Sequence, residues 1–299
     1  MKDDHDKDPP PFVAGVVIPA HNDALGLARL LDRVVADDLQ VVVVPNGCVD
    51  GTADVARAYP GVRVVELECA SKTAALAAGD AVATAYPRVY VDADVAVDAA
   101  SVRRLAEALG SAEGPDCEAA GLGTALVAGP TRLIDGRGAH PLVRSYYRVW
   151  ERLPSVRSGV FGRGVIAMTQ GGHERIRCLP AVLADDLVVS EAFMQHERLI
   201  LPDAWVTIYP PRTVRDLLRR RERVSTGIRQ ADQAGLRVKA HATTPVDLLA
   251  IIRAEPALIG HVAAFVMVTA VGRIRARRRV RSGDFSTWQR DESSRTDVS

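Results

Sequence analysis

Cysteine and aromatic residues are scarce in this chain of 299 residues, and neither sign of charge prevails. The 4 cysteines form no Cys-x-x-Cys pair, which argues against a zinc ribbon or a disulfide framework and favours a reducing compartment. Only 5% of residues are aromatic and no nucleic-acid reader motif accompanies the arginine-rich stretches, so we expect no nucleic-acid partner. The net charge of +1 and the 47% of hydrophobic residues are typical of a globular chain that can bury a large core.

Two common nucleotide-binding motifs are also missing. Neither G-x-G-x-x-G after the first apolar run nor G-x-x-x-x-G-K-[ST] occurs, which argues against a dinucleotide-binding fold and a P-loop. Residues 1–11 are acidic and proline-rich, unlike the basic and then apolar start of a secretory signal. We therefore expect a cytoplasmic protein.

Apolar runs rich in β-branched residues alternate with amphipathic segments in the first third of the chain. The pattern predicts buried strands over residues 12–18, 40–44, 62–67 and 88–92. Helices are predicted after the first three strands: one capped by Asn22 or Asp23, one over residues 51–59 capped by Asp50, and one over residues 73–86. This alternation predicts an α/β fold, a doubly wound and mostly parallel sheet with helices on both faces.

Polar clusters follow three of these strands: His21 to Asp23, Asn46 to Asp50, and Asp92 with Asp94. In such sheets, ligands bind beyond the carboxyl ends of the strands. Two carboxylates separated by one small residue suit Mg²⁺ or Mn²⁺ on a diphosphate, although Asp is also common in plain turns.

Four segments, in this order, resemble the family 2 glycosyltransferases of the GT-A fold: Val17–Asn22, Asn46–Thr52, Ser71–Gly79 and Asp92–Asp94. The resemblance covers about two-thirds of the chain. It implies that Ala20, His21 and Asn46 contact the nucleoside and that Lys72 contacts the phosphates. It also implies that Asp92 binds the donor diphosphate through a Mn²⁺ or Mg²⁺ ion shared with Asp94.

One position departs from the family pattern. Asn46 stands where the family often has an acidic residue, and an amide both accepts and donates, whereas a carboxylate only accepts. The pair Asn46-Gly47 also suits a tight turn. A UDP-sugar is the favoured donor and a GDP-sugar the second candidate.

The second half of the resemblance concerns the acceptor. Residues 161–168 are glycine-rich and then apolar, which predicts a loop and a strand, and Asp185-Asp186 stands where the family usually has Glu-Asp. Asp186 is the expected base that takes the proton of the acceptor hydroxyl, with a helix N-cap as the alternative.

A cluster of arginines follows the predicted strand over residues 201–209. Arg220, Arg221 and Arg223 are expected to contact the leaving diphosphate, with a solvated amphipathic helix as the alternative. The processive relatives carry Gln-x-x-Arg-Trp in this region, and this chain has no such match, so a single transfer is favoured over polymerisation.

The most apolar segment, residues 256–272, is followed directly by arginines up to residue 281. As a helix it spans roughly 25 Å, short of the ~30 Å hydrocarbon core of a membrane. Two interpretations of this segment are left open. It is either a helix packed in the protein core or a helix that lies on the inner face of a membrane, with its arginines on the lipid headgroups.

Together these patterns predict a disordered tail (1–11), a nucleotide-sugar-binding half (12–125), an acceptor-binding half (126–211), a helical basic extension (212–281) and a polar tail (282–299). Membrane association of the extension is left open. The predicted activity is inverting, metal-dependent transfer of a sugar from a nucleoside diphosphate sugar to a hydroxyl acceptor. A nucleotidyltransferase-like enzyme and a catalytically silent GT-A binding protein are the alternatives.

Overall fold

The computed structural model describes residues 12–110, 125–178, 186–233 and 243–282. Among these residues, eight strands form one sheet in the order β3-β2-β1-β4-β7-β6-β8-β5. The strands are β1 (Ala14–Ala20), β2 (Leu39–Pro45), β3 (Arg63–Val64), β4 (Arg88–Val91), β5 (Val95–Val97), β6 (Val127–Ile134), β7 (Val165–Met168) and β8 (Arg198–Ile208).

The first half of the sheet is parallel, as predicted. β1 pairs with β2 from Ala14↔Leu39 to Ala20↔Pro45, and β1 and β2 also pair in parallel with β4 and β3 respectively. β7 pairs antiparallel with both β4 and β6, so the whole sheet is mixed. The parallel pairing places the residues that follow β1, β2 and β4 at one edge.

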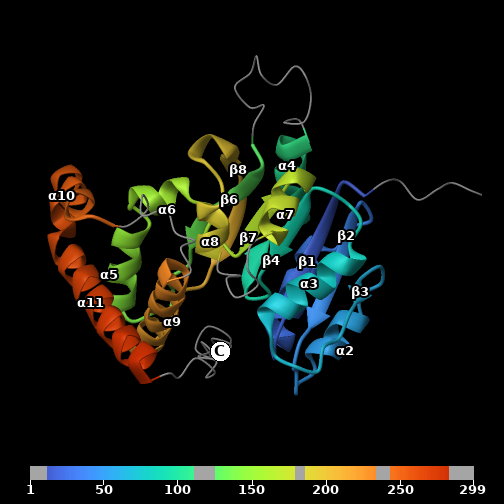
Figure 1. The fold of residues 1–299 in the computed structure, drawn as a ribbon, viewed down its shortest axis with the longest axis horizontal. Coiled ribbons are helices and arrows are strands. Elements are labelled where there is room, and N and C mark those ends of the chain that lie inside the picture. Colours follow the sequence, from blue (N-terminus) through green and yellow to red (C-terminus); the bar gives the residue numbers. More distant parts are fainter. Residues whose placement is uncertain (1–11, 111–124, 179–185, 234–242, 283–299) are drawn as a thin grey trace, which may run out of the picture. The chain divides into compact units, whose positions relative to one another are not determined.

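Helices cover both faces of the parallel strands. α3 (Lys72–Val82) lies across β1 and β2, where Val17, Val42 and Val44 form a buried cluster with Ala75 (Figure 1). Because side chains alternate along a strand, Val16 and Val43 point to the other face. That face is covered by α1 (Ala24–Val34) and α4 (Ala99–Gly110), through buried leucines such as Leu27 and Leu105.

Four predicted boundaries were wrong. β1 continues through Pro19, which the sheet tolerates because pairing with β4 ends at Val17. The third strand has only two residues, and α3 ends at Val82 instead of Tyr86 because Ala83 is extended. The N-cap of α2 (Thr52–Arg57) is Gly51, although Asp50 still accepts a hydrogen bond from the amide of Thr52.

The chain divides into two compact units. Unit 1 comprises residues 1–131, 164–175 and 201–206, and unit 2 comprises residues 132–163, 176–200 and 207–299, so the division falls once within β6 and twice within β8. The short helix α7 (Gln170–Arg177) begins two residues after β7, and all but its last two residues belong to unit 1.

Unit 2 is mainly helical. Its elements are α5 (Pro141–Trp150), α6 (Pro154–Ser158), α8 (Asp186–Glu191), η4 (Gln195–Glu197), α9 (Val214–Gln233), α10 (Pro245–Ala254), η6 (Pro256–Leu258) and α11 (Ile259–Ser282). Tyr146 of α5 stacks on Phe265 of α11 with ring centroids 5.0 Å apart, and Leu217 of α9 is fully buried in the same core. The apolar segment predicted over residues 256–272 is therefore a helix with one face packed on α5 and α9.

Candidate active site

The loops that follow β1 and β2 interlock in unit 1. The ring Nδ1 of His21 lies 2.6 Å from the backbone oxygen of Asn46 and donates to it, since a carbonyl only accepts. Asn22, in the left-handed region with φ 45°, accepts from the amide of Val49 at 2.7 Å. The amide of Asp23 donates to Thr52 Oγ1 at 2.8 Å, and the Asp23 carboxylate caps α1. These bonds hold both predicted donor loops in one fixed arrangement.

Asn46 is the buried centre of this arrangement, with 3% of its surface exposed. Its Nδ2 donates to the carbonyl oxygens of Ala20 at 2.8 Å and Val44 at 3.2 Å. Its Oδ1 accepts from the amide of Ser71 at 3.1 Å, next to the first residue of α3. The side chain that the resemblance assigns to the nucleoside is thus bonded within the protein through both of its polar atoms.

Asp92 and Asp94 lie in a turn between β4 and β5. The amide of Asp92 donates to the carbonyl oxygen of Gly164 at 2.8 Å, and Gly164 takes a φ of +66° where a Cβ would lie 2.4 Å from Val95 Cγ1. Lys72 Nζ, at the start of α3, lies 2.6 Å from Asp92 Oδ1. This turn therefore holds both predicted carboxylates, Asp92 and Asp94. The predicted Lys72 pairs with the first of them.

The donor set at this turn fits a hard divalent cation. Asp94 is exposed and the side chain of Asp92 is 37% exposed, so both carboxylates are accessible to solvent. Across the described ranges, no group of three or more His, Cys, Asp or Glu residues could hold a metal ion. A cation at Asp92 and Asp94 would then complete its shell with oxygens from water and from a bound diphosphate.

In unit 2, Asp186 begins α8 and accepts a hydrogen bond from the amide of Gly162 at 2.5 Å. Arg132 donates to the carbonyl oxygens of Gly162 at 3.4 Å and of Val156, and its guanidinium lies 4.8 Å from the ring centroid of Trp150. Burial lowers the pKa of Arg132 to about 10, partly opposed by the charge of Asp186. Sequence reasoning missed Arg132 and Gly162, although the Gly-Arg-Gly run at 162–164 was the available signal.

The three arginines of α9 have different surroundings. Arg223 is exposed and Arg220 is half-buried. Arg221 packs against Gly272 of α11, with its guanidinium 5.8 Å from the ring centroid of Tyr146. Arg221 is thus part of the helical core of unit 2, whereas Arg223 faces solvent.

Four further polar residues are not assigned to the candidate site. His173 is buried in unit 1 and bonds to Tyr86, and His196 lies in η4. Asp185 and His241 lie outside the described residues.

Comparison with known proteins identifies the class. Residues 15–117 match the model of the family described as Glycosyl transferase family 2. The mannosyltransferase PcManGT from Pyrobaculum calidifontis, solved with GDP-Man and Mn²⁺, is 20% identical, with 95% of this chain and 80% of that chain covered and a TM-score of 0.55. Glucosyl-3-phosphoglycerate synthase from Mycobacterium tuberculosis, solved with Mn²⁺, UDP and glucosyl-3-phosphoglycerate, is 18% identical, with 75% and 81% covered and a TM-score of 0.51. No curated protein sequence matches the chain.

The fold is that of the GT-A glycosyltransferases. Residues 15–117, which carry all four motif segments from Val17 to Asp94, are a glycosyl transferase family 2 domain. The resemblance inferred from the sequence is confirmed, and the chain is a glycosyltransferase.

Proposed function

We propose that the chain transfers a sugar from a nucleoside diphosphate sugar to a hydroxyl acceptor, once and with inversion, with the help of Mn²⁺ or Mg²⁺. The observation that carries the proposal is the ion pair of Lys72 with Asp92, next to Asp94, at the edge of the sheet where the interlocked donor loops end. Both solved relatives contain Mn²⁺, one with GDP-Man and the other with UDP.

Each residue of the donor site has a role in this reaction. His21 and Ala20 support the nucleoside, and Asn46 fixes the loops around it. Lys72 contacts phosphate, and Arg220 and Arg223 are the candidates for a further phosphate contact, since Arg221 packs in the helical core. A cation held by Asp92 and Asp94 would neutralise the diphosphate and so make it a better leaving group.

Inversion follows from a single displacement. The acceptor oxygen forms a bond to the anomeric carbon as the bond from that carbon to the phosphate oxygen breaks. Asp186 takes the proton of the acceptor hydroxyl on its carboxylate, and the nucleoside diphosphate leaves. The amide of Gly162 donates to Asp186 and so orients its carboxylate for this step. The charge of Asp186 also acts on the nearby Arg132.

Calorimetric binding of UDP, GDP, ADP and dTDP, with and without Mn²⁺, tests the proposal. We expect UDP to bind most tightly, only with Mn²⁺, and we expect Asp94→Ala to lose this binding. Asp54→Ala removes an exposed carboxylate of unit 1 that pairs with Arg57, and serves as the matched control. If folded protein binds none of the four nucleotides, the transferase proposal is wrong. Metal-dependent donor hydrolysis that survives in Asp186→Asn would remove that residue from the mechanism.

The outer face of α11 supports a second part of the proposal, a contact with an anionic membrane surface. Residues Pro256–Arg278 are long and apolar enough to cross a membrane, but Val262, Phe265 and Val268 are buried in the helical core. Exposed apolar side chains mark the opposite face, and arginines follow; they are Ile259, Val266, Met267 and Ile274, then Arg275, Arg277 and Arg278. A helix with one face packed on protein and the other apolar and basic suits the interface of a bilayer.

Vesicle co-sedimentation tests whether this face of α11 binds a membrane or a second copy of the chain. We expect the protein to bind vesicles that contain phosphatidylglycerol and to bind phosphatidylcholine vesicles weakly. We also expect Val266→Ser with Met267→Ser to reduce binding. Absence of binding to both vesicle types would exclude the membrane contact, and a dimer lost in the same double variant would assign the face to a second copy of the chain.

A further inference from the structure

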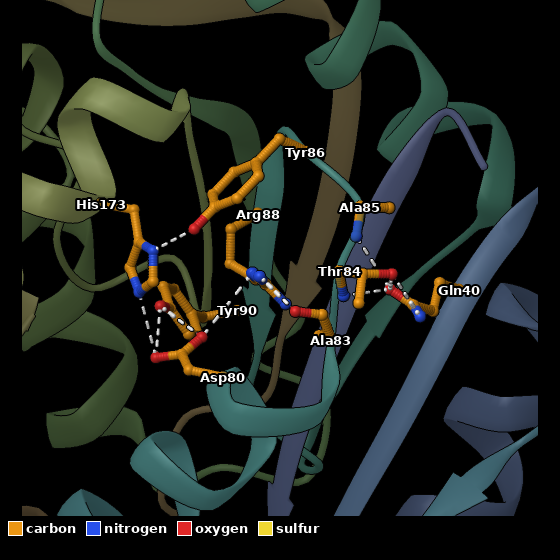
Figure 2. Close-up of polar contacts among 9 residues, drawn as sticks. All are labelled: Gln40, Asp80, Ala83, Thr84, Ala85, Tyr86, Arg88, Tyr90 and His173. Carbon is orange, nitrogen blue, oxygen red and sulfur yellow. Dashed lines mark hydrogen bonds and ion pairs between the residues drawn. The ribbon is translucent and has the colours of Figure 1, made fainter. Parts of the chain in front are cut away.

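A polar cluster inside unit 1 joins α3, β4 and α7 (Figure 2). It consists of Asp80 on α3, Arg88 and Tyr90 on β4, His173 on α7, and Tyr86 in the loop between α3 and β4. The side chains of Arg88 and His173 are 2% and 4% exposed. We call these five residues the Asp80 cluster. None of them has a role in the reaction proposed above.

Asp80 is the common partner in this cluster. The hydroxyl of Tyr90 donates to its carboxylate and lies 2.9 Å from each oxygen. His173 Nε2 lies 3.2 Å from Oδ2, and Arg88 Nε lies 3.6 Å from Oδ1. Burial, and then the Asp80 charge, raise the pKa of Tyr90 above its ordinary value, so its hydroxyl remains a donor at neutral pH.

The outer members of the cluster are held in turn by their neighbours. His173 Nδ1 forms a hydrogen bond of 2.5 Å with the Tyr86 hydroxyl, while its Nε2 faces Asp80. Arg88 donates to the carbonyl oxygen of Ala83 at 2.7 Å and lies 4.8 Å from the ring centroid of Tyr86. Each side chain of the cluster therefore has a defined orientation (Figure 2).

The cluster gives α3 directional contacts that its packing supplies only in part. Leu76, Ala78 and Val82 pack on the core of the sheet but are only partly buried. Only Ala75 and Gly79 are buried among the residues of this helix. A Cβ on Gly79 would lie 2.4 Å from Val17 Cγ1, so the helix backbone lies close against β1. Small residues permit this approach, but they interlock weakly along the helix axis, since ridges and grooves are formed by larger side chains. Hydrogen bonds at Asp80 resist the sliding that packing alone permits.

The elements that the Asp80 cluster joins are the ones that carry the donor site. α3 begins at Lys72, eight residues before Asp80, and Asp92 follows Tyr90 by two residues at the end of β4. A helix moves as a stiff rod over this length of about 12 Å. Any shift of Asp80 along β4 is therefore passed on to Lys72, which lies 2.6 Å from Asp92.

We propose that Asp80 and Tyr90 are positioning residues for the donor site, since their hydrogen bond fixes Lys72 against Asp92 and hence the geometry in which the diphosphate binds. The cluster is expected to add little to the stability of the fold, because the desolvation of buried charged groups costs about as much free energy as their attraction gains. This inference rests on the proposed function.

Tyr90→Phe tests the inference, because it removes the hydroxyl and keeps the ring. Calorimetry with Mn²⁺ and UDP, and again with GDP, is carried out at a temperature where every variant is folded. We expect about tenfold weaker binding, as for a small displacement of a binding group. Tyr59→Phe is the matched control, because it removes an equivalent bond, from the Tyr59 hydroxyl to Asp32 at 2.6 Å, without touching α3 or β4. We expect less than a twofold change in the control.

Asp80→Asn is the second variant, since an amide oxygen still accepts from Tyr90 while the charge is lost. We expect an affinity between those of wild type and Tyr90→Phe. Unchanged affinity in Tyr90→Phe, or an equal loss in Tyr59→Phe, would reduce the cluster to a structural role. If wild type itself binds no nucleotide, the proposed function fails first, and that result is distinct from a wild type that binds as tightly as its variants.

Discussion

At Gly162, a single backbone conformation orients the candidate base. Its φ is +63°, its amide donates to Asp186, and its carbonyl oxygen accepts from Arg132. A Cβ at this position would lie 3.0 Å from two ring carbons of Trp150. The residue is therefore restricted to glycine both by its dihedral angle and by its neighbour.

We expect Gly162→Ala to lower both the stability and the turnover. The left-handed conformation costs an alanine about 1 kcal/mol, and crowding against Trp150 adds to this cost. Gly138→Ala is the matched control, since Gly138 has a φ of +72° and no atom within 4 Å of a Cβ. Calorimetric unfolding and the rate of donor hydrolysis are the measurements. An equal loss of turnover in both variants would show that Gly162 does not position Asp186.

The hydrogen bonds of Asn46 show why a carboxylate would be unfavourable at this position. Its amide nitrogen faces two carbonyl oxygens in a site that is 3% exposed, and an aspartate there would place an acceptor against both of them. We expect Asn46→Asp to be destabilised by about 3 kcal/mol and Asn46→Ala by less, because alanine loses the bonds without the repulsion. Urea unfolding measures both variants. The reverse order of stability would show that the amide is oriented the other way.

At the scale of elements, the sequence predicts the parallel half of the sheet better than the other half. The spacing of Leu27, Leu30, Leu31, Val34 and Val35 predicts α1. The first four are buried, and Val35 is the half-buried C-cap. The order β7-β6-β8-β5 depends on pairing between distant segments, which no local periodicity specifies. The Asp80 cluster could not be predicted for the same reason, because Asp80 and His173 belong to separate helices.

The candidate site was also predictable from the sequence only in part. Motif segments located Lys72, Asp92 and Asp94. In the structure, Lys72 at the start of α3 pairs with Asp92, in the turn that also holds Asp94. The fixed orientation of Asn46 could not be foreseen, because it depends on where the carbonyl oxygens of Ala20 and Val44 point.

The pair of Asp38 and Arg103 connects the segment before β2 to α4 and gives a pH-dependent prediction. Arg103 donates from Nε and Nη2 to the two carboxylate oxygens at 2.6 and 2.7 Å, which lowers the pKa of Asp38. The contribution to stability is full above the unfolded pKa of about 3.9 and is lost as the pH falls through the lower folded value.

We expect Arg103→Met to cost about 0.5 kcal/mol at pH 7, since both side chains are more than a third exposed, and less at pH 2. Denaturant unfolding at the two pH values gives the difference. An equal loss at both would assign the effect to packing of the arginine stem.

For the whole molecule, the proposed donor and base residues belong to different compact units. Lys72, Asp92 and Asp94 lie in unit 1, and Asp186 and the arginines of α9 lie in unit 2. A ligand stabilises the native state of whatever unit binds it, by RT ln(1 + [L]/Kd). Because Asp186 is proposed to act on the acceptor and not on the nucleotide, nucleotide binding should not depend on the base.

We expect Mn²⁺ with the preferred nucleotide, at about a hundred times its Kd, to stabilise wild type by about 2.7 kcal/mol and so to raise Tm by several degrees. Asp186→Asn should retain the full shift, because the carboxylate acts on the acceptor hydroxyl and not on the nucleotide. Asp94→Ala should lose it, because the nucleotide is held through the cation. Scanning calorimetry of the three proteins decides the matter: a shift that survives in Asp94→Ala would place the nucleotide elsewhere, and a shift lost in Asp186→Asn would make that residue part of the donor site.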